Sequence, residues 1–219
     1  MTPERFARTQ AWIRERFAPD ADWYLATMAR ACAAGLPSID AGPETARLLQ
    51  VLILAASARR VVEVGTLAGA TTVLLARALS AGGRVITIER DAGHAAVARA
   101  VFIGAGVADR VELRETTGLA AIEALHAELG DGGVDLVFLD AQRSEYVPML
   151  PTLRRLLRTG GVLAIDNALS AGRWLPDPAP AGSPRDTMEE VCDAVRADGA
   201  FVSTVVPVGN GLLLAVRAG

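Results

Sequence analysis

The sequence predicts an α/β fold with a mostly parallel sheet and helices on both faces. Short runs rich in β-branched residues alternate with stretches of helical pattern from about residue 61 onward. These runs are almost continuously apolar, which is typical of strands buried on both faces of a parallel sheet. The alternation stops near the C-terminus, where two strand-like runs follow each other directly. Right-handed crossovers make such a sheet doubly wound, with an antiparallel hairpin at its end.

The elements follow in a regular order. Residues 3–35 predict two helices broken near Pro19, and a third helix begins near Pro43–Glu44. Strands are then expected, separated by helices, at 61–64, 85–89, 110–114, 134–140 and 161–166. Residues 201–217 predict the closing pair of strands, joined by a short turn that contains Asn210-Gly211. Asn-Gly favours the positive φ angles of a tight hairpin.

The chain of 219 residues predicts one domain, because it contains no repeat and no linker. We divide it into an N-terminal helical segment, residues 1–36, and a core, residues 37–219. The net charge of −3 does not point to nucleic acid, although a local basic patch stays compatible with it. The two cysteines, Cys32 and Cys192, lie far apart, which argues against a thiolate metal site and a disulfide scaffold.

No feature of the sequence predicts a membrane or export segment. Residues 1–17 are charged throughout and contain no apolar signal core. No window reaches the roughly 18 apolar residues of a spanning helix. We therefore expect a cytoplasmic protein.

A glycine-rich turn between a strand and a helix is the first candidate binding motif. In VVEVGTLAGATT, residues 61–72, Gly65 and Gly69 allow close backbone approach. The helix after them directs free N–H groups at an anion, and Thr71 adds a hydroxyl. The G-x-x-x-G spacing does not match the dinucleotide fingerprint. Glu63 would repel a pyrophosphate but suits a cationic ligand, and S-adenosylmethionine carries both an ammonium and a sulfonium group.

Glu89 strengthens this interpretation. It closes the second strand, 24 residues after Gly65, where an acid accepts hydrogen bonds from both ribose hydroxyls. The alternative is a glycine turn kept for packing and a solvated acid at a strand end. The interval to Glu89, together with the C-terminal hairpin, favours the cofactor.

Three oxygen-bearing side chains end the next two strands. Asp140 follows the fourth strand, and Asp166 and Asn167 follow the fifth. If these strands are neighbours, the side chains meet at one rim and form a hard, incomplete ligand set of the kind that Mg²⁺ prefers. His94 and His126 fall on predicted helices and do not compete. The alternative is that each aspartate caps the helix after it.

These motifs together resemble the catechol O-methyltransferase-like family, especially its bacterial members. The resemblance runs from about Pro37 to the C-terminus and rests on these stretches in order: VVEVGTLAGATT, VITIERD, ADRVELRETTG, DLVFLDAQRSEY, LLRTGGVLAIDNAL and GRW. It implies a Rossmann-like class I methyltransferase with a seven-stranded sheet, usually a homodimer, that uses S-adenosylmethionine and commonly Mg²⁺.

The resemblance also implies roles for individual residues. Gly65, Thr66 and Gly69 would form the cofactor loop, and Thr71 would hold the methionine carboxylate. Glu89 would bind the ribose, and Thr117 and Gly118 would flank the adenine. The implied metal ligands are Asp140, Asp166 and Asn167, with Asp140 also beside the cofactor.

The chain departs from the family pattern at two places. Thr116-Thr117-Gly118 stands where the family commonly has Gly-Asp-Ala, so adenine contacts there are expected from hydroxyl or backbone groups. Arg143 stands where the family commonly has a lysine that is the candidate general base. Arginine stays protonated, so Arg143 can stabilise an oxyanion but cannot readily take the proton. The alternatives are a surface arginine paired with Glu145, and altered or weak chemistry.

The leading function is methylation of a small substrate with catechol-like or other vicinal hydroxyls, because two adjacent oxygens can chelate the metal. The alternatives are methylation of a tRNA hydroxyuridine, hinted at only by Arg143, Arg173 and Arg185, and a non-catalytic binding or dimerisation module. The few aromatic residues mildly disfavour a single-stranded nucleic acid.

Two segments could cover the site. The Pro- and Gly-rich residues 168–186 predict a long loop beside it, a candidate lid in which Trp174 lines an aromatic pocket or simply packs. The N-terminal helices, with Trp12, Trp23 and Tyr24, cover the site, form a dimer interface or serve ordinary packing.

Overall fold

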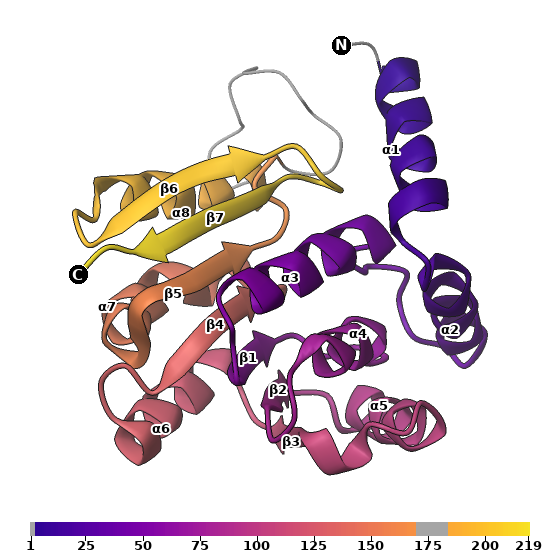
Figure 1. Cartoon of the computed structure of the whole chain (residues 1–219), viewed down its shortest axis with the longest axis horizontal. Coiled ribbons are helices and arrows are strands. Elements are labelled where there is room, and N and C mark those ends of the chain that lie inside the picture. Colours follow the sequence, from indigo (N-terminus) through magenta and orange to yellow (C-terminus); the bar gives the residue numbers. More distant parts are fainter. Residues whose placement is uncertain (1–2, 170–183) are drawn as a thin grey trace.

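The computed structural model describes residues 3–169 and 184–219. Within them one mixed sheet has the strand order β3-β2-β1-β4-β5-β7-β6 (Figure 1). The strands are β1 Arg60–Val64, β2 Arg84–Glu89, β3 Val111–Glu115, β4 Val134–Leu139, β5 Leu157–Ile165, β6 Phe201–Val206 and β7 Leu212–Arg217. The first five are parallel, and β7 lies antiparallel between β5 and β6. The predicted mostly parallel sheet with a C-terminal hairpin is confirmed.

Helices cover both faces of this sheet. They are α1 Pro3–Phe17, α2 Ala21–Ala33, α3 Pro43–Ala55, α4 Ala70–Ala78, α5 Ala92–Gly104, α6 Gly118–Leu129, α7 Tyr146–Leu156 and α8 Pro184–Ala197. One core cluster packs α6, α7 and α8 on one face, and a second packs α3, α4 and α5 on the other. A third, smaller cluster joins α2 to α3 and α4. No helix of the described residues has the length and apolarity needed to cross a membrane.

Three local predictions differ from the structure. Asn210 does not adopt a positive φ, because residues 207–211 form a longer connection in which Gly209 and Gly211 take φ of 54° and 86°. The Asn210 side chain instead reaches Asn167, and its carbonyl accepts the N–H of Leu169. Strand β5 begins at Leu157, four residues before the apolar run, and β3 begins one residue later than predicted because Arg110 belongs to a short 3₁₀ turn.

Candidate active site

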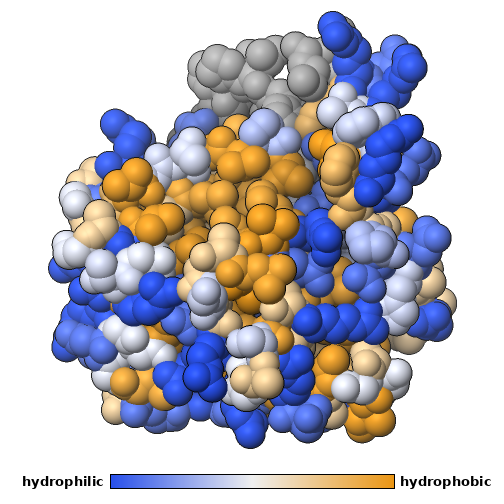
Figure 2. All heavy atoms as spheres, in the orientation of Figure 1, coloured by the Kyte–Doolittle hydropathy of each residue, from blue (hydrophilic) through white to orange (hydrophobic). Residues whose placement is uncertain are grey.

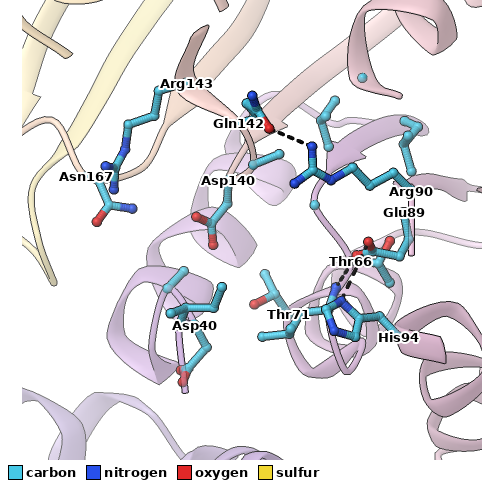
Figure 3. Close-up of a pocket in the computed structure, with 18 of the residues that line it drawn as sticks. Asp40, Thr66, Thr71, Glu89, Arg90, His94, Asp140, Gln142, Arg143 and Asn167 are labelled. Atoms are coloured by element: carbon cyan, nitrogen blue, oxygen red, sulfur yellow. Dashed lines mark hydrogen bonds and ion pairs between the residues drawn. The ribbon is translucent and has the colours of Figure 1, made fainter. Parts of the chain in front are cut away.

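A cavity of about 810 Å³ lies beyond the carboxyl ends of the parallel strands. Its wall comes from α2, the segment that precedes α3, the loops after β1, β2 and β4, and the turn after β5. Parallel strands end at one edge of the sheet, so segments far apart in the sequence face a common space (Figures 1 and 3).

The glycine turn has the tight geometry that the sequence predicts. Gly65 has a φ of 102°, and a Cβ there would fall on the backbone oxygen of Asp140, so only glycine fits. Gly69, with φ 79°, precedes the first residue of α4, and a Cβ would lie 2.5 Å from the ring of Phe102. Gly65, Thr66 and Thr71 line the cavity, whereas Gly69 shapes the turn from behind.

Glu63 does not reach the cavity, which corrects the expectation that it faces a cationic ligand. The side chain has no exposed surface and accepts hydrogen bonds from the hydroxyls of Thr72 and Thr87, the latter at 2.6 Å. Thr87 in turn contacts the hydroxyl of Thr66 at 2.6 Å. Burial raises the pKa of Glu63 to about 7, and the two threonine hydroxyls oppose the shift. Glu63 therefore supports the glycine turn from inside the fold.

Glu89, at the end of β2, also lines the cavity. Its carboxylate accepts the N–H groups of Leu67 at 2.9 Å and Asp91 at 3.0 Å, which fixes it against the glycine turn. The ring of His94 lies 3.7 Å away. Each carboxylate oxygen has two lone pairs, so the fixed side chain can still accept hydroxyl donors from the cavity.

The turn before α6 differs in detail from the prediction. Thr116 and Gly118 line the cavity, but Thr117 is exposed and does not. Thr117 occupies the N-cap position of α6 with extended backbone angles, and its side chain makes no cap hydrogen bond. Gly118 is required because a Cβ would lie 2.6 Å from Met149 and 2.7 Å from Val64.

The structure brings the three rim residues together. Leu139 of β4 pairs in register with Ile165 of β5, and the N–H of Asp166 donates to the Leu139 carbonyl at 3.0 Å. Asp140 and Asp166 therefore follow paired positions on neighbouring strands. Asp140 and Asn167 line the cavity, and Asn167 turns into it with a φ of 65°. Asp166 lies just behind, 2 % exposed.

The pKa values of both aspartates are raised by their surroundings. Burial raises the pKa of Asp140 well above its ordinary value, and the charges of Asp166, Glu63 and Asp40 raise it further, against Arg143. Burial raises the pKa of Asp166 to about 6, opposed by the backbone of Asn167 and by Arg143. Oδ1 of Asp166 is buried without a hydrogen-bond partner, while Oδ2 accepts the Asn167 amide at 2.7 Å.

These residues fit a hard divalent cation. No group of three or more His, Cys, Asp or Glu side chains suited to a metal occurs among the described residues, so the set depends on the asparagine. Two carboxylates, one of them with a buried oxygen that has no hydrogen-bond partner, and a carboxamide lie at the ends of two neighbouring strands. A cation there would favour the charged form of both carboxylates, against the burial that raises both pKa values.

Arg143 faces the same space. It begins a 3₁₀ turn, Arg143–Glu145, and lines the cavity with its guanidinium directed towards Asn167 (Figure 3). It makes no hydrogen bond or ion pair with any side chain in the described residues. Glu145 instead accepts the N–H of Leu119 at 3.1 Å, so the alternative of an Arg143–Glu145 surface pair is wrong.

Several cavity residues were not predicted to belong to the site. Asp40 ends the segment GLPSID, residues 35–40, and joins the wall through the loop before α3. His94 lies on a helix as expected, yet its position in the first turn of α5 places it in the wall. Arg90 donates to Gln142 at 2.5 Å across two loops. The sequence marks GLPSID as a segment without a role for its acid, and no residue pattern marks Arg90 or His94, because tertiary contacts bring these side chains to the cavity.

The aromatic residues of the N-terminal segment lie in different environments. Tyr24 is fully buried and lines the cavity. Trp23 instead packs under the guanidinium of Arg77, whose Cζ lies 4.8 Å from the centroid of the Trp23 ring. Trp12 is 50 % exposed on α1 and contacts Phe17. Of the predicted loop at residues 168–186, positions 170–183 with Arg173 and Trp174 lie outside the described residues, as does the Arg185 side chain. Residues 184–186 belong to α8, so the prediction of a loop there is wrong.

Comparisons with known proteins agree in sequence and in fold. The model of a family described as O-methyltransferase matches residues 18–218. The chain is 37% identical over 194 residues to a catechol O-methyltransferase of Mycobacterium tuberculosis, covering 87% of this chain and 86% of the other. An O-methyltransferase from Bacillus cereus in complex with S-adenosylhomocysteine superposes with a TM-score of 0.86 at 28% identity, covering 99% and 100%. TomG of Streptomyces achromogenes, in complex with S-adenosylmethionine, gives 0.85 at 26% identity, covering both chains completely.

Proposed function

The chain belongs to the O-methyltransferase family, and from this premise we propose its substrate and its metal. We propose that it methylates one hydroxyl of a small catechol-like or other vicinal-hydroxyl substrate, using S-adenosylmethionine and a divalent cation such as Mg²⁺. The observation that carries the proposal is the meeting of Asp140 and Asp166 at paired strand ends beside the cofactor cavity. The orphaned Asp166 oxygen supports a cation there.

The wall residues divide the cavity between the two reactants. The turn at Gly65 and Thr66 and the start of α4 suit the methionine half of the cofactor, since free N–H groups there favour an anion. Glu89 suits the ribose, and Thr116 and Gly118 suit the adenine. Asp140 and Asn167 then face the reacting end, with Asp166 behind them.

Methyl transfer is an in-line displacement in which a substrate oxygen forms a bond to the methyl carbon while the sulfonium bond breaks. The oxygen must lose its proton to solvent water, because Arg143 stays protonated and does not accept it. A divalent cation, when bound, lowers the pKa of a coordinated hydroxyl as it does for water. Arg143 holds positive charge beside the resulting oxyanion and clamps an anionic substrate. The reaction therefore depends on the acids that hold the cation more than on a side-chain base.

A methyl-transfer assay with S-adenosylmethionine, catechol and Mg²⁺ tests this, with the product identified by mass spectrometry. We expect Asp140→Ala to abolish turnover and Arg143→Lys to retain much of it, since lysine keeps the positive charge. Asp193→Ala is the matched control, because Asp193 is exposed and its ion pair in the described part of the chain is with Arg196. Wild-type turnover by Asp140→Ala in the presence of a chelator would refute the mechanism.

Three further expectations belong to the same proposal. A homodimer, which the family resemblance implies, is tested by light scattering after size-exclusion chromatography. A cytoplasmic location is supported by two free cysteines. A small molecule is favoured over tRNA because the four acids that line the cavity, Asp40, Glu89, Asp140 and Glu145, outnumber its two arginines, Arg90 and Arg143. Calorimetry that finds no binding of S-adenosylmethionine would instead favour a non-catalytic module.

A further inference from the structure

We propose that Tyr24 of the N-terminal helix α2 is a cofactor-binding residue that, together with Thr71, holds the methionine carboxylate. This inference rests on the proposed use of S-adenosylmethionine. It makes α2 part of the cofactor site and not only a cover or an interface segment. The family resemblance implies this role only for Thr71, at the start of α4.

The contact that carries the inference joins α2 to the first turn of α4. The hydroxyl of Tyr24 lies 3.0 Å from the hydroxyl of Thr71, and both residues line the cavity. Tyr24 is buried and belongs to the cavity wall, so the cavity is the side from which a ligand would meet it. It therefore stands beside the helix end where an anion would be received.

The start of α4 has donors to spare. Gly69 precedes the helix and has no side chain with which to cap it, so the first N–H groups have no cap oxygen. The Tyr24–Thr71 pair holds two hydroxyl protons, and their mutual hydrogen bond uses only one. Asp40 also interacts with the Tyr24 side chain, so a ligand carboxylate would compete with this acid for the second O–H. Burial raises the pKa of Tyr24 well above its ordinary value, and the charge of Asp40 raises it further, so the phenol keeps its proton.

Contacts outside the cavity fix α2 in this position. Arg77 of α4 pairs with Asp20 at 2.9 Å and lies over the ring of Trp23. Tyr24 thus approaches Thr71 on a helix that is already anchored, and the hydroxyl needs little reorganisation to bind. The competing explanation is that the Tyr24–Thr71 bond only ties two helices together.

Two ligands separate these explanations. S-adenosylhomocysteine carries the amino-acid carboxylate, whereas 5′-methylthioadenosine keeps the nucleoside and sulfur but lacks it. We expect Tyr24→Phe to weaken S-adenosylhomocysteine about tenfold by calorimetry, as for loss of a hydrogen bond to a charged group. Its affinity for 5′-methylthioadenosine should stay within about twofold of wild type, because the contact concerns the carboxylate alone.

Two more variants complete the test. Thr71→Val should show the same ligand discrimination, and combining it with Tyr24→Phe should cost less than the two separate losses together, because the residues act as a pair. Asp20→Asn is the control, since it loosens α2 outside the cavity and should change neither affinity selectively. Equal losses for both ligands in Tyr24→Phe, or no loss, would overturn the inference. A wild type that binds neither ligand would refute the proposed function itself.

Discussion

At the scale of single residues, Glu63 shows what a local pattern can and cannot predict. The glycine turn after it was recognisable from the residues themselves, because Gly65 serves a need of the backbone. The direction of the Glu63 side chain follows from the two-residue period of a strand, which places it on the same face as Val61. That face packs under α3 and α4, as the core contacts of Val61 and Val73 show. The prediction that Glu63 faces a cationic ligand was wrong because it considered only the charge of the side chain and not this two-residue period.

The buried acid gives the protein a specific pH dependence. The Glu63 pKa is about 7 in the fold against 4.5 for the ordinary group, so the folded state binds the extra proton between these values. Its contribution to stability is therefore fully present below pH 4.5 and is lost as pH rises through about 7. A shift of this size corresponds to about 3 kcal/mol.

We expect Glu63→Gln to remove this loss, because glutamine resembles the protonated acid and its oxygen can still accept the two threonine hydroxyls. The measurement is urea unfolding of both proteins at several pH values from 4 to 8. The difference in free energy of unfolding should change in favour of the variant as pH rises. A difference that is constant with pH would show that Glu63 does not titrate in the fold.

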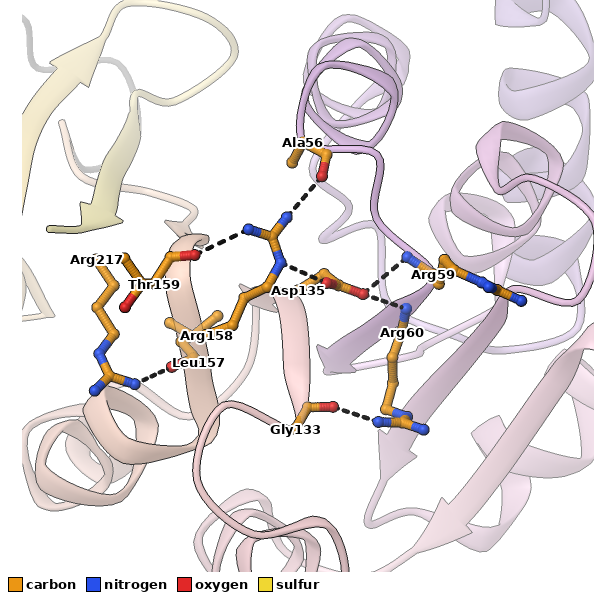
Figure 4. Close-up of polar contacts among 9 residues, drawn as sticks. All are labelled: Ala56, Arg59, Arg60, Gly133, Asp135, Leu157, Arg158, Thr159 and Arg217. Carbon is orange, nitrogen blue, oxygen red and sulfur yellow. Dashed lines mark hydrogen bonds and ion pairs between the residues drawn. The ribbon is translucent and has the colours of Figure 1, made fainter. Parts of the chain in front are cut away.

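At the scale of elements, the order of helices and strands was predictable, since each apolar run carries its own period. The ends of elements were less so, because they depend on contacts between elements. Strand β5 extends back to Leu157, where Arg158 donates to Asp135 of β4 at 2.6 Å and to the carbonyl of Ala56 (Figure 4). Asp135 also accepts the backbone N–H groups of Arg59 and Arg60, so one acid joins three strand starts. No periodicity in the sequence marks that junction.

The first helix depends on a similar tie. Arg14 of α1 donates to Glu44 of α3 at 2.6 Å, and the Glu44 side chain is only 6% exposed. We expect Arg14→Gln to leave this acid without its partner and to destabilise the docking of α1 by about 1 kcal/mol. Hydrogen exchange should then accelerate across α1 while α2, held by Arg77, stays protected.

Arg16→Gln is the control for this prediction. Arg16 is 51% exposed and pairs with its neighbour Glu15, so its loss should leave α1 exchange nearly unchanged. Equal acceleration in both variants would mean that general helix charge, and not the Glu44 contact, holds α1.

At the scale of the whole molecule, the two packed faces leave one edge of the sheet for chemistry. The convergence of Asp140, Asp166 and Asn167 at that edge was predictable, because it needs only the adjacency of two parallel strands. The contributions of Asp40, His94 and Tyr24 were not, because they depend on where α2, α5 and the loop before α3 pack. The hydropathy view shows apolar side chains gathered around the middle of one face (Figure 2). The cavity wall is instead mixed in character, which suits a ligand with both charged and flat apolar parts.

The rim acids link cation binding to the stability of the whole fold. A ligand that binds only the folded state stabilises it by about 2.7 kcal/mol at one hundred times its dissociation constant, which corresponds to roughly 5–10 °C in the melting temperature of a chain of this size. Protons compete for the same carboxylates, and the Asp166 pKa of about 6 sets the range in which they do so. Without a cation, the raised pKa means that stability is lost as pH rises through this value, so a bound cation restores the most stability at pH 8.

We expect saturating Mg²⁺ to raise the melting temperature clearly at pH 8 and little at pH 5. Asp166→Asn should lose most of the shift at pH 8, whereas Asp193→Asn, on the exposed face of α8, should keep it. An Mg²⁺ shift that is as large at pH 5 as at pH 8, or that survives in Asp166→Asn, would place the cation elsewhere on the molecule.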